Sequence, residues 1–165
     1  DQAKTFIYAF IYGAGNAKIG EIVGGGDTQG RIMKANFLSK IPALSLLMNQ
    51  VKGLAARRGW LRGIDGRKLP VRSEHSALNL LLQSTGAILM KQATVLLMDY
   101  IDEEELDAKL VLHVHDEVQL EAKAEDAERV GQLAVKAMRH AGLNFKMECP
   151  TDGEFKIGNT WAETH

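Results

Sequence analysis

Hydrophobic positions recur at helical spacing through the first part of the chain. Within residues 1–12, phenylalanine and isoleucine pairs stand four residues apart, and Gly13-Ala14-Gly15 follows as a helix stop. Glycine and proline then divide the following residues into further helical segments. One short helix is predicted to begin near Ala17. A second is predicted from Thr28 to Leu38, and a third from Ile41-Pro42 to about Arg58.

The pattern then changes from helical to mixed. Residues 59–72 combine glycine and proline with scattered apolar residues, which predicts short strands, and Asp65-Gly66 is a turn signal. Leucines next repeat at helical spacing from Ser73 or Glu74 to about Met98, which predicts one long helix. This helix is predicted to end at the acidic stretch Asp99 to Asp107. An amphipathic helix is then predicted from Ala124 to Ala141, closed by Gly142, and a strand from Phe145 to Met147.

Residues 118–121 alternate between apolar and polar side chains, and residues 111–114 set Val111 and His113 against Leu112 and Val114, which together predict two strands joined by a tight turn. The turn begins with His115-Asp116 and contains neither glycine nor asparagine. Those two residues adopt the backbone angles of a two-residue hairpin turn most easily. We therefore expect a turn that is either strained or wider than two residues, and backbone strain clusters at functional sites.

Composition places the chain among globular proteins. Its 165 residues are 45% apolar and 25% charged, which fits one ordinary folded domain and gives no sign of disorder. The single cysteine, Cys149, cannot form an internal disulfide, which favours a reducing compartment. No signal peptide and no uninterrupted apolar span suited to a bilayer is apparent. The sequence therefore predicts a cytoplasmic protein with no membrane partner.

The net charge of −1 hides a difference between the two halves of the chain. Residues 1–74 hold 12 basic and 5 acidic side chains and residues 75–165 hold 8 and 16, so the halves carry +7 and −8. Basic side chains are densest between Lys52 and Arg72, where the one acidic residue is Asp65. A surface for a polyanion on the first half is expected, although basic loops are also common on ordinary surfaces.

The predicted hairpin turn carries two adjacent carboxylates, Asp116 and Glu117. Carboxylates this close repel one another, and a divalent cation keeps both ionised at neutral pH. Oxygen ligands favour magnesium, often with phosphate as a further ligand. Two alternatives stay open: a solvated polar tip, which is commoner, and a zinc site built from His113 and His115, for which no cysteine or further histidine lies nearby.

Two predicted helices carry polar side chains at a spacing of four. Lys4, Tyr8 and Tyr12 share one face of the first helix, where an ammonium can hold phosphate and the rings can stack on bases. Tyrosines half-buried against a core are the plainer explanation. On the predicted long helix, the same spacing relates His75, Asn79 and Gln83. Their side chains could hydrogen-bond to base edges in a nucleic-acid groove or could simply face solvent.

Three motifs, taken together and in order, carry a resemblance. Lys4-x3-Tyr8-x3-Tyr12-Gly13, the Leu-Leu-Gln-Ser-Thr-Gly segment at 81–86, and His115-Asp116-Glu117 resemble motif B, the minor-groove helix and motif C of the A-family DNA polymerases, the DNA polymerase I type. Within that family, several segments are most similar to the replicative polymerases of T-odd phages. They are Tyr8 to Gly15, Asp65 to Lys68, Arg72-Ser73, and Trp161 to His165.

The resemblance, which runs along essentially the whole chain, implies an α+β fold that is part of a right-hand polymerase. Residues 1–74 would form a fingers segment, and residues 75–165 the C-terminal part of an antiparallel-sheet palm. The implied activity is template-directed DNA synthesis, with a DNA primer-template and deoxynucleoside triphosphates as partners and two Mg²⁺ ions as cofactors.

The resemblance also implies roles on the nucleotide side. Lys4 would hold the triphosphate and protonate the leaving pyrophosphate, and Tyr8 would pack against the sugar and base. Tyr12 with Gly13 would border the templating base. Either phenylalanine or tyrosine stands at the position of Tyr8 in the family, and the tyrosine implies ready use of chain terminators.

On the DNA side, the resemblance makes Asp116 a magnesium ligand and places Glu117 beside it near the primer terminus. His115 would contact the primer strand. The residues along the minor groove of the new base pair would be Asn79, Gln83 and His75.

Two parts of the family's site are absent from this chain. They are a second metal-binding aspartate and an arginine that stands just before the position of Asp1. We therefore expect an upstream remainder of the polymerase as a partner, and no polymerisation by this piece alone. The rival hypothesis is a non-catalytic nucleic-acid-binding module whose DNA binding depends on neither Asp116 nor magnesium.

Overall fold

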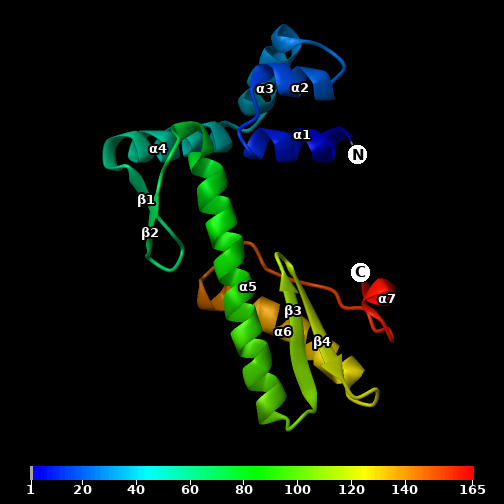
Figure 1. Cartoon of the computed structure of the whole chain (residues 1–165). Coiled ribbons are helices and arrows are strands. Elements are labelled where there is room, and N and C mark those ends of the chain that lie inside the picture. Colours follow the sequence, from blue (N-terminus) through cyan, green and yellow to red (C-terminus); the bar gives the residue numbers. More distant parts are fainter. Residues whose placement is uncertain (1) are drawn as a thin grey trace. The chain divides into compact units, whose positions relative to one another are not determined.

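The structure, a computed structural model, describes residues 2–165. The chain packs as two units, one reaching to Ser84 and one running from Thr85 to His165. The elements are labelled in Figure 1: α1 (Gln2–Ile11), α2 (Asn16–Ile22), α3 (Asp27–Lys40), α4 (Pro42–Arg58), β1 (Trp60–Arg62), β2 (Lys68–Pro70), the 3₁₀ helix η1 (Glu74–Ser76), α5 (Ala77–Glu103), β3 (Ala108–Val114), β4 (Glu117–Ala122), α6 (Ala127–Asn144) and α7 (Trp161–Thr164).

Helix α1 ends where the glycine signal predicted. Gly13 has a φ of 79°, and its amide donates to the carbonyl of Phe10 at 3.0 Å. Glycine adopts this left-handed conformation without Cβ strain, so it closes a helix readily. Phe6 and Phe10 face inward and form a small core with Ile19 of α2 and Phe37 of α3. The opposite face of α1 is thereby left to solvent.

The hairpin β1–β2 packs against α4, which begins at Pro42 as predicted. Leu61 of β1 pairs with Leu69 of β2 in an antiparallel register, and both side chains are buried. They pack with Val51 of α4, and the predicted turn at Asp65-Gly66 joins the two strands. The short strands predicted between residues 59 and 72 are confirmed.

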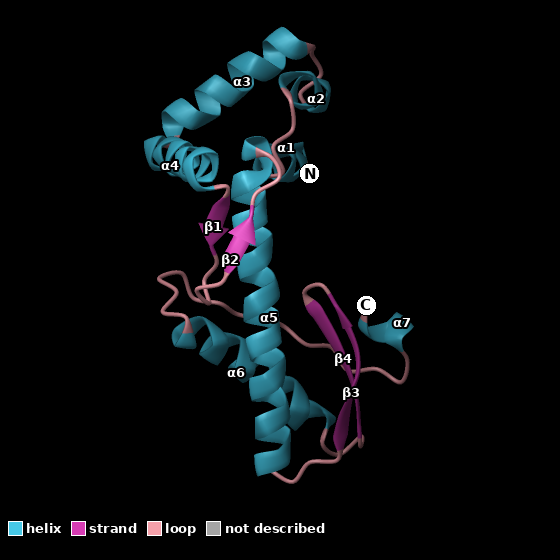
Figure 2. Cartoon of the chain, turned by 60° about the vertical axis from the view of Figure 1, so that its left-hand side comes forward, coloured by secondary structure: helices cyan, strands magenta, loops and turns pink. Residues whose placement is uncertain are grey.

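The second unit joins the later turns of α5 with α6 and the hairpin β3–β4, as seen in Figure 2. Leu97 and Ile101 of α5 and Leu133 of α6 are almost fully buried, and Val118 and Leu120 of β4 pack against them. The division between the units lies inside α5. The proposed fingers and palm segments, 1–74 and 75–165, stay a prediction.

The hairpin β3–β4 is antiparallel and turns over two residues. Val114 pairs with Glu117, so His115-Asp116 forms the turn, and a bulge lies between Leu110 and Leu112. His115 has a φ of 51°, which is uncommon for a residue with a side chain and stores strain. Of the two expected outcomes, the structure has the strained two-residue turn.

Two predictions about the second half were wrong, and a third missed a boundary. Helix α5 ends inside the acidic stretch as predicted, but at Glu103 rather than about Met98, because Ile101 is buried in the core and holds the last turns in place. Helix α6 does not close at Gly142 and runs on to Asn144. No strand forms at Phe145–Met147, and within residues 2–165 the strands make only two two-stranded sheets.

Gly142 is present for close packing rather than as a helix stop. It is buried inside α6, and a Cβ added there would overlap the side chain of Thr151 from the segment that follows the helix. Gly131, nearer the start of the same helix, lies in the same way beneath the ring of Phe155. These two glycines let the C-terminal segment lie directly on α6.

We expect Gly142→Ala to lower the free energy of unfolding by about 1–3 kcal/mol, because an added methyl group overpacks the contact with Thr151. The matched control is Gly53→Ala in the exposed middle of α4, where a Cβ meets nothing within 4 Å. There alanine should add roughly 0.5–1 kcal/mol of stability. Urea unfolding followed by circular dichroism measures both, and equal stability of the two variants would contradict this packing.

One helical stretch, Glu74–Glu103, is long and apolar enough to cross a membrane by length and composition. This is weak evidence, because the core helices of soluble proteins pass the same test. Leu97 and Ile101 are moreover buried against other parts of the protein. A cytoplasmic location without a membrane partner stays a prediction.

Candidate active site and nucleic-acid interface

The face of α1 that carries Lys4, Tyr8 and Tyr12 is open to solvent. Both tyrosines are 53% exposed, whereas Phe6 and Phe10 on the other face are buried. The ammonium of Lys4 lies 6.0 Å from the centre of the Tyr8 ring. The plainer reading of these tyrosines, as half-buried core residues, does not hold. A cation and two rings are therefore available to a ligand along one helix face.

Tyr12 and Gly13 are joined to the polar residues near the start of α5. Gln83 donates from Nε2 to the hydroxyl of Tyr12 at 2.8 Å. A Cβ on Gly13 would lie 2.8 Å from the carbonyl oxygen of His75, so glycine is required there for space as well as for its backbone angle. The structure thus brings together four of the residues that the sequence singled out.

Asn79 belongs to the same region of α5 and holds an unsatisfied acceptor. Its Oδ1 atom is buried and, among the described residues, has no hydrogen-bond partner. A buried acceptor without a partner costs about 1–3 kcal/mol, and native structures keep few of them. Such a group is suited to a hydrogen bond from a ligand.

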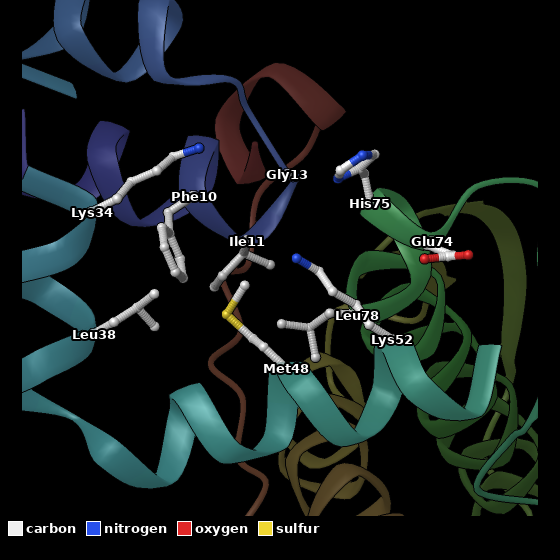
Figure 3. Close-up of a pocket in the computed structure, with 10 residues that line it drawn as sticks. All are labelled: Phe10, Ile11, Gly13, Lys34, Leu38, Met48, Lys52, Glu74, His75 and Leu78. Carbon is white, nitrogen blue, oxygen red and sulfur yellow. The ribbon is translucent and has the colours of Figure 1, made fainter. Parts of the chain in front are cut away.

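A cavity of about 190 Å³ opens beside Gly13 and His75. Figure 3 shows Lys34 of α3 and Lys52 of α4 among its lining residues. Burial, and then the charge of Lys52, lower the pKa of Lys34, while Asp27 acts in the opposite direction. Sequence reasoning did not single out Lys34, since a lysine within a polar helix gives no signal of a cavity.

The basic segment of the first half is exposed along α4 and the β1–β2 hairpin. Arg58 and Lys68 lie over the ring of Trp60, at 5.7 and 5.0 Å from its centre. Arg67 pairs with Asp65 at 2.6 Å. Arg57, Arg62 and Arg72 lie exposed on the surface, where they can meet a polyanion, and this role stays a prediction.

In the second unit, the turn after Val114 presents a free carboxylate. Asp116 is exposed, and within residues 2–165 no side chain hydrogen-bonds or pairs with it. His115, the strained residue before it, is also exposed. The turn therefore offers Asp116 to a ligand at a fixed point of the hairpin.

Glu117, in contrast, is fully engaged by the protein. Three groups reach its carboxylate: Gln119 Nε2 at 2.5 Å, Trp161 Nε1 at 3.0 Å and His165 Nδ1 at 2.9 Å. Hydrogen bonds from Gln119, His165 and Trp161, in that order of effect, hold the pKa of this carboxyl below its usual range. Sequence reasoning placed Glu117 near the site but found none of these partners. Two of them lie more than forty residues away along the chain.

The described residues supply only part of a metal site. Asp116 offers the oxygen donor that magnesium prefers. Among residues 2–165, however, no group of three or more histidine, cysteine or acidic side chains could hold a metal ion. This argues against the zinc alternative, and His115 lies in the turn beyond the strand of His113, so the two do not continue one strand face. A magnesium site is compatible with Asp116 only if further ligands come from outside these residues.

Comparison with known proteins places the chain in one family. The model of DNA polymerase family A matches residues 1–163. The DNA-directed DNA polymerase of Escherichia phage Phieco32 is 40% identical over 172 residues, with 100% of this chain and 28% of the relative aligned. That of Escherichia phage T7 is 38% identical over 186 residues, with 100% of this chain and 26% of the relative aligned. The chain thus spans about a quarter of the length of these relatives.

The fold agrees with a solved polymerase. The POL domain of Pol1 from M. smegmatis, in complex with DNA primer-template and dNTP, superposes with a TM-score of 0.77 over 95% of this chain and 29% of that one, at 18% sequence identity. This likeness supports the α+β fold predicted from the motifs. On the match of its sequence from residue 1 to residue 163, and on the identity with the phage enzymes, the chain belongs to DNA polymerase family A.

Proposed function

We propose that this chain supplies the nucleotide-binding helix and one catalytic carboxylate of a template-directed DNA polymerase. The observation that carries the proposal is the free carboxylate of Asp116 on a strained two-residue turn. An exposed acid that no neighbour engages is suited to bind a cation, and a rigid turn fixes where that cation sits. The family and the exposed face of α1 support the same function.

On the nucleotide side, Lys4 binds the triphosphate as a point charge and can protonate the leaving pyrophosphate. The ring of Tyr8 packs against the sugar and base of the incoming nucleotide. Tyr12 and Gly13 border the templating base, where the missing Cβ of Gly13 leaves room beside His75. Positioning of this kind accounts for much of the catalysis of phosphoryl transfer.

On the DNA side, Asn79 and Gln83 contact the minor groove of the new base pair and His115 contacts the primer strand. His75 lies along the same groove. The amide N–H groups of Gln83, one of which here donates to Tyr12, can donate to acceptors in the groove, whereas the unpartnered Oδ1 of Asn79 is an acceptor that the N2 amino group of guanine can satisfy. Acceptor positions in the minor groove are nearly the same for all pairs, so these contacts test pair shape rather than sequence.

Asp116 is the proposed magnesium ligand of this chain. Asp116 would hold magnesium as part of a two-metal mechanism, in which one ion would lower the pKa of the primer 3′ hydroxyl and the other would neutralise charge on the triphosphate and leaving group. Among the described residues the turn offers one such free carboxylate, and we propose that further ligands come from an upstream segment of the polymerase. We accordingly propose that the isolated chain does not polymerise.

The test is primer extension by a completed polymerase, meaning this chain joined to the upstream polymerase segment of the phage T7 relative. We expect extension that requires magnesium, a primer-template and all four deoxynucleoside triphosphates. The control is the same protein without magnesium but with EDTA. A completed polymerase that binds primer-template and never extends it would contradict the proposal.

The rival function, a non-catalytic nucleic-acid-binding module, is supported by the exposed basic segment of the first half. It predicts DNA binding that neither Asp116→Ala nor magnesium changes, together with no extension. The same completed polymerase therefore distinguishes the two functions.

We further predict that Lys4→Gln raises the KM for deoxynucleoside triphosphates and lowers kcat, together by about 10²-fold or more in kcat/KM. Both effects follow because the charge that binds the triphosphate and the acid that serves the leaving group are lost together. Lys18→Gln is the control, since Lys18 is exposed on α2 and, within residues 2–165, its one ion pair is with Glu21 at 2.9 Å. Steady-state kinetics with one nucleotide measures the change, and equal kcat/KM in both variants would contradict the role of Lys4.

A further inference from the structure

The C-terminal segment is fixed along α6 before it reaches the hairpin. The hydroxyl of Thr151 donates to the carbonyl of Met138 at 2.7 Å, and Arg139 donates to both carboxylate oxygens of Asp152 at 2.9 and 3.1 Å. Gly131 makes room for the ring of Phe155 further along. These contacts determine where the last residues of the chain can lie.

The short helix α7 and the residue after it then meet Glu117 with two donors. The indole N–H of Trp161 donates to Oε1 at 3.0 Å, and Nδ1 of His165 donates to Oε2 at 2.9 Å. The two rings support each other, with centres 5.7 Å apart and planes inclined by 70°. One donor thus reaches each oxygen of the carboxylate, which fixes both its position and its rotation.

A second link between α7 and Glu117 passes through Gln119. The amide of Gln119 donates to Glu117 Oε1 at 2.5 Å, and the hydroxyl of Thr164 donates to Gln119 Oε1 at 3.1 Å. The hydroxyl of Thr164 also lies 3.1 Å from the carbonyl of Trp161. Because Thr164 donates to the amide oxygen of Gln119, the amide is oriented with its N–H group toward the carboxylate of Glu117.

We propose that Trp161 and His165 are positioning residues for nucleotide addition, because they hold the carboxylate of Glu117 in one orientation beside Asp116. The inference rests on the proposed function of Asp116. Glu117 follows Asp116 directly and opens β4, so a fixed Glu117 side chain also limits the motion of the turn that carries Asp116. A site held within a fraction of an ångström loses rate when such a support is removed.

The ring of Trp161 is 51% exposed, so packing supports it only in part, and its N–H bond to Glu117 Oε1 is the polar contact that ties it to the hairpin. Trp161→Phe therefore removes the donor while it keeps an aromatic ring against His165.

The test is a double-mutant cycle between Trp161→Phe and Glu117→Ala in the completed polymerase. We expect Trp161→Phe to lower kcat about tenfold, with the KM for deoxynucleoside triphosphates and the Kd for primer-template unchanged. In the Glu117→Ala background the same substitution should cost nothing further, because its target is gone. A loss of equal size in both backgrounds, or a loss of primer-template affinity, would overturn the proposal.

Rescue by a conservative variant gives a second measurement. His165→Ala should lower kcat, and His165→Gln, which keeps a donor, should recover most of the loss. Glu154→Gln is the control, because Glu154 is exposed in the same segment and no described residue engages it. Trp161→Phe and His165→Ala that match the unmodified enzyme, while Asp116→Asn is inactive, would overturn the positioning role alone. An active Asp116→Asn variant would instead overturn the proposed function.

Discussion

Replacing Asp116 with asparagine should abolish DNA synthesis by the completed polymerase while leaving its affinity for primer-template nearly unchanged. Asparagine has the shape of aspartate but lacks the charge that binds a cation. Loss of a metal ligand removes several kcal/mol of transition-state stabilisation, so the rate of nucleotide addition should fall by about 10³-fold or more. Single-turnover extension with excess enzyme measures this rate directly.

The matched control for Asp116 is Asp102→Asn at the exposed end of α5. Asp102 belongs to the acidic stretch that the sequence assigns to solvated surface, and within residues 2–165 its side chain has no partner. We expect this variant to extend primers at the unmodified rate. If Asp116→Asn also retains that rate, Asp116 is not a catalytic residue and the turn is a solvated tip.

The second large effect concerns the choice between ordinary nucleotides and chain terminators. Tyr8→Phe should make the completed polymerase reject dideoxynucleotides more strongly, by roughly 10²-fold or more in the ratio of kcat/KM values. The phenol oxygen of Tyr8 can take the place of the missing sugar hydroxyl as a polar partner, and phenylalanine cannot. The hydroxyl is free to do so, because Tyr8 is 53% exposed on α1.

Tyr100→Phe is the control for this experiment. Its hydroxyl lies 2.6 Å from Nδ1 of His140 in the second unit, so the variant removes a phenol oxygen elsewhere in the protein. We expect the ratio of dideoxy to deoxy incorporation to stay at the unmodified value. Equal ratios for the unmodified enzyme and Tyr8→Phe would rule out the polar role of Tyr8.

The elements that the sequence predicted well are those whose signals are local. Helix α1 was predicted because its apolar spacing and the stop at Gly13 lie within one stretch, and Gly13 does adopt the left-handed conformation. The hairpin was predicted from its side-chain pattern, and the lack of glycine predicted a turn either strained or wider, of which the structure has the strained one. Spacing placed Lys4, Tyr8 and Tyr12 on one face of α1, but it favoured half-buried tyrosines, and their exposure is seen only in the structure.

The elements that were missed depend on partners far away along the chain. Glycine is the residue type that commonly ends a helix, but Gly142 is needed for a different reason, which is that Thr151 packs directly on it. The last turns of α5 form because Ile101 is buried among residues from α6, which no local pattern reveals. The bonds from Trp161 and His165 to Glu117 bridge 44 and 48 residues and have no periodic signal.

The most direct test of the account is a crystal structure of the completed polymerase with primer-template, magnesium and a nucleotide that cannot react. The account predicts that the ammonium of Lys4 contacts the triphosphate of that nucleotide. It also predicts that a carboxylate oxygen of Asp116 binds a magnesium ion beside the phosphate that would react with the primer. A structure in which the nucleotide occupies its site and neither residue contacts it or its metal would contradict the account.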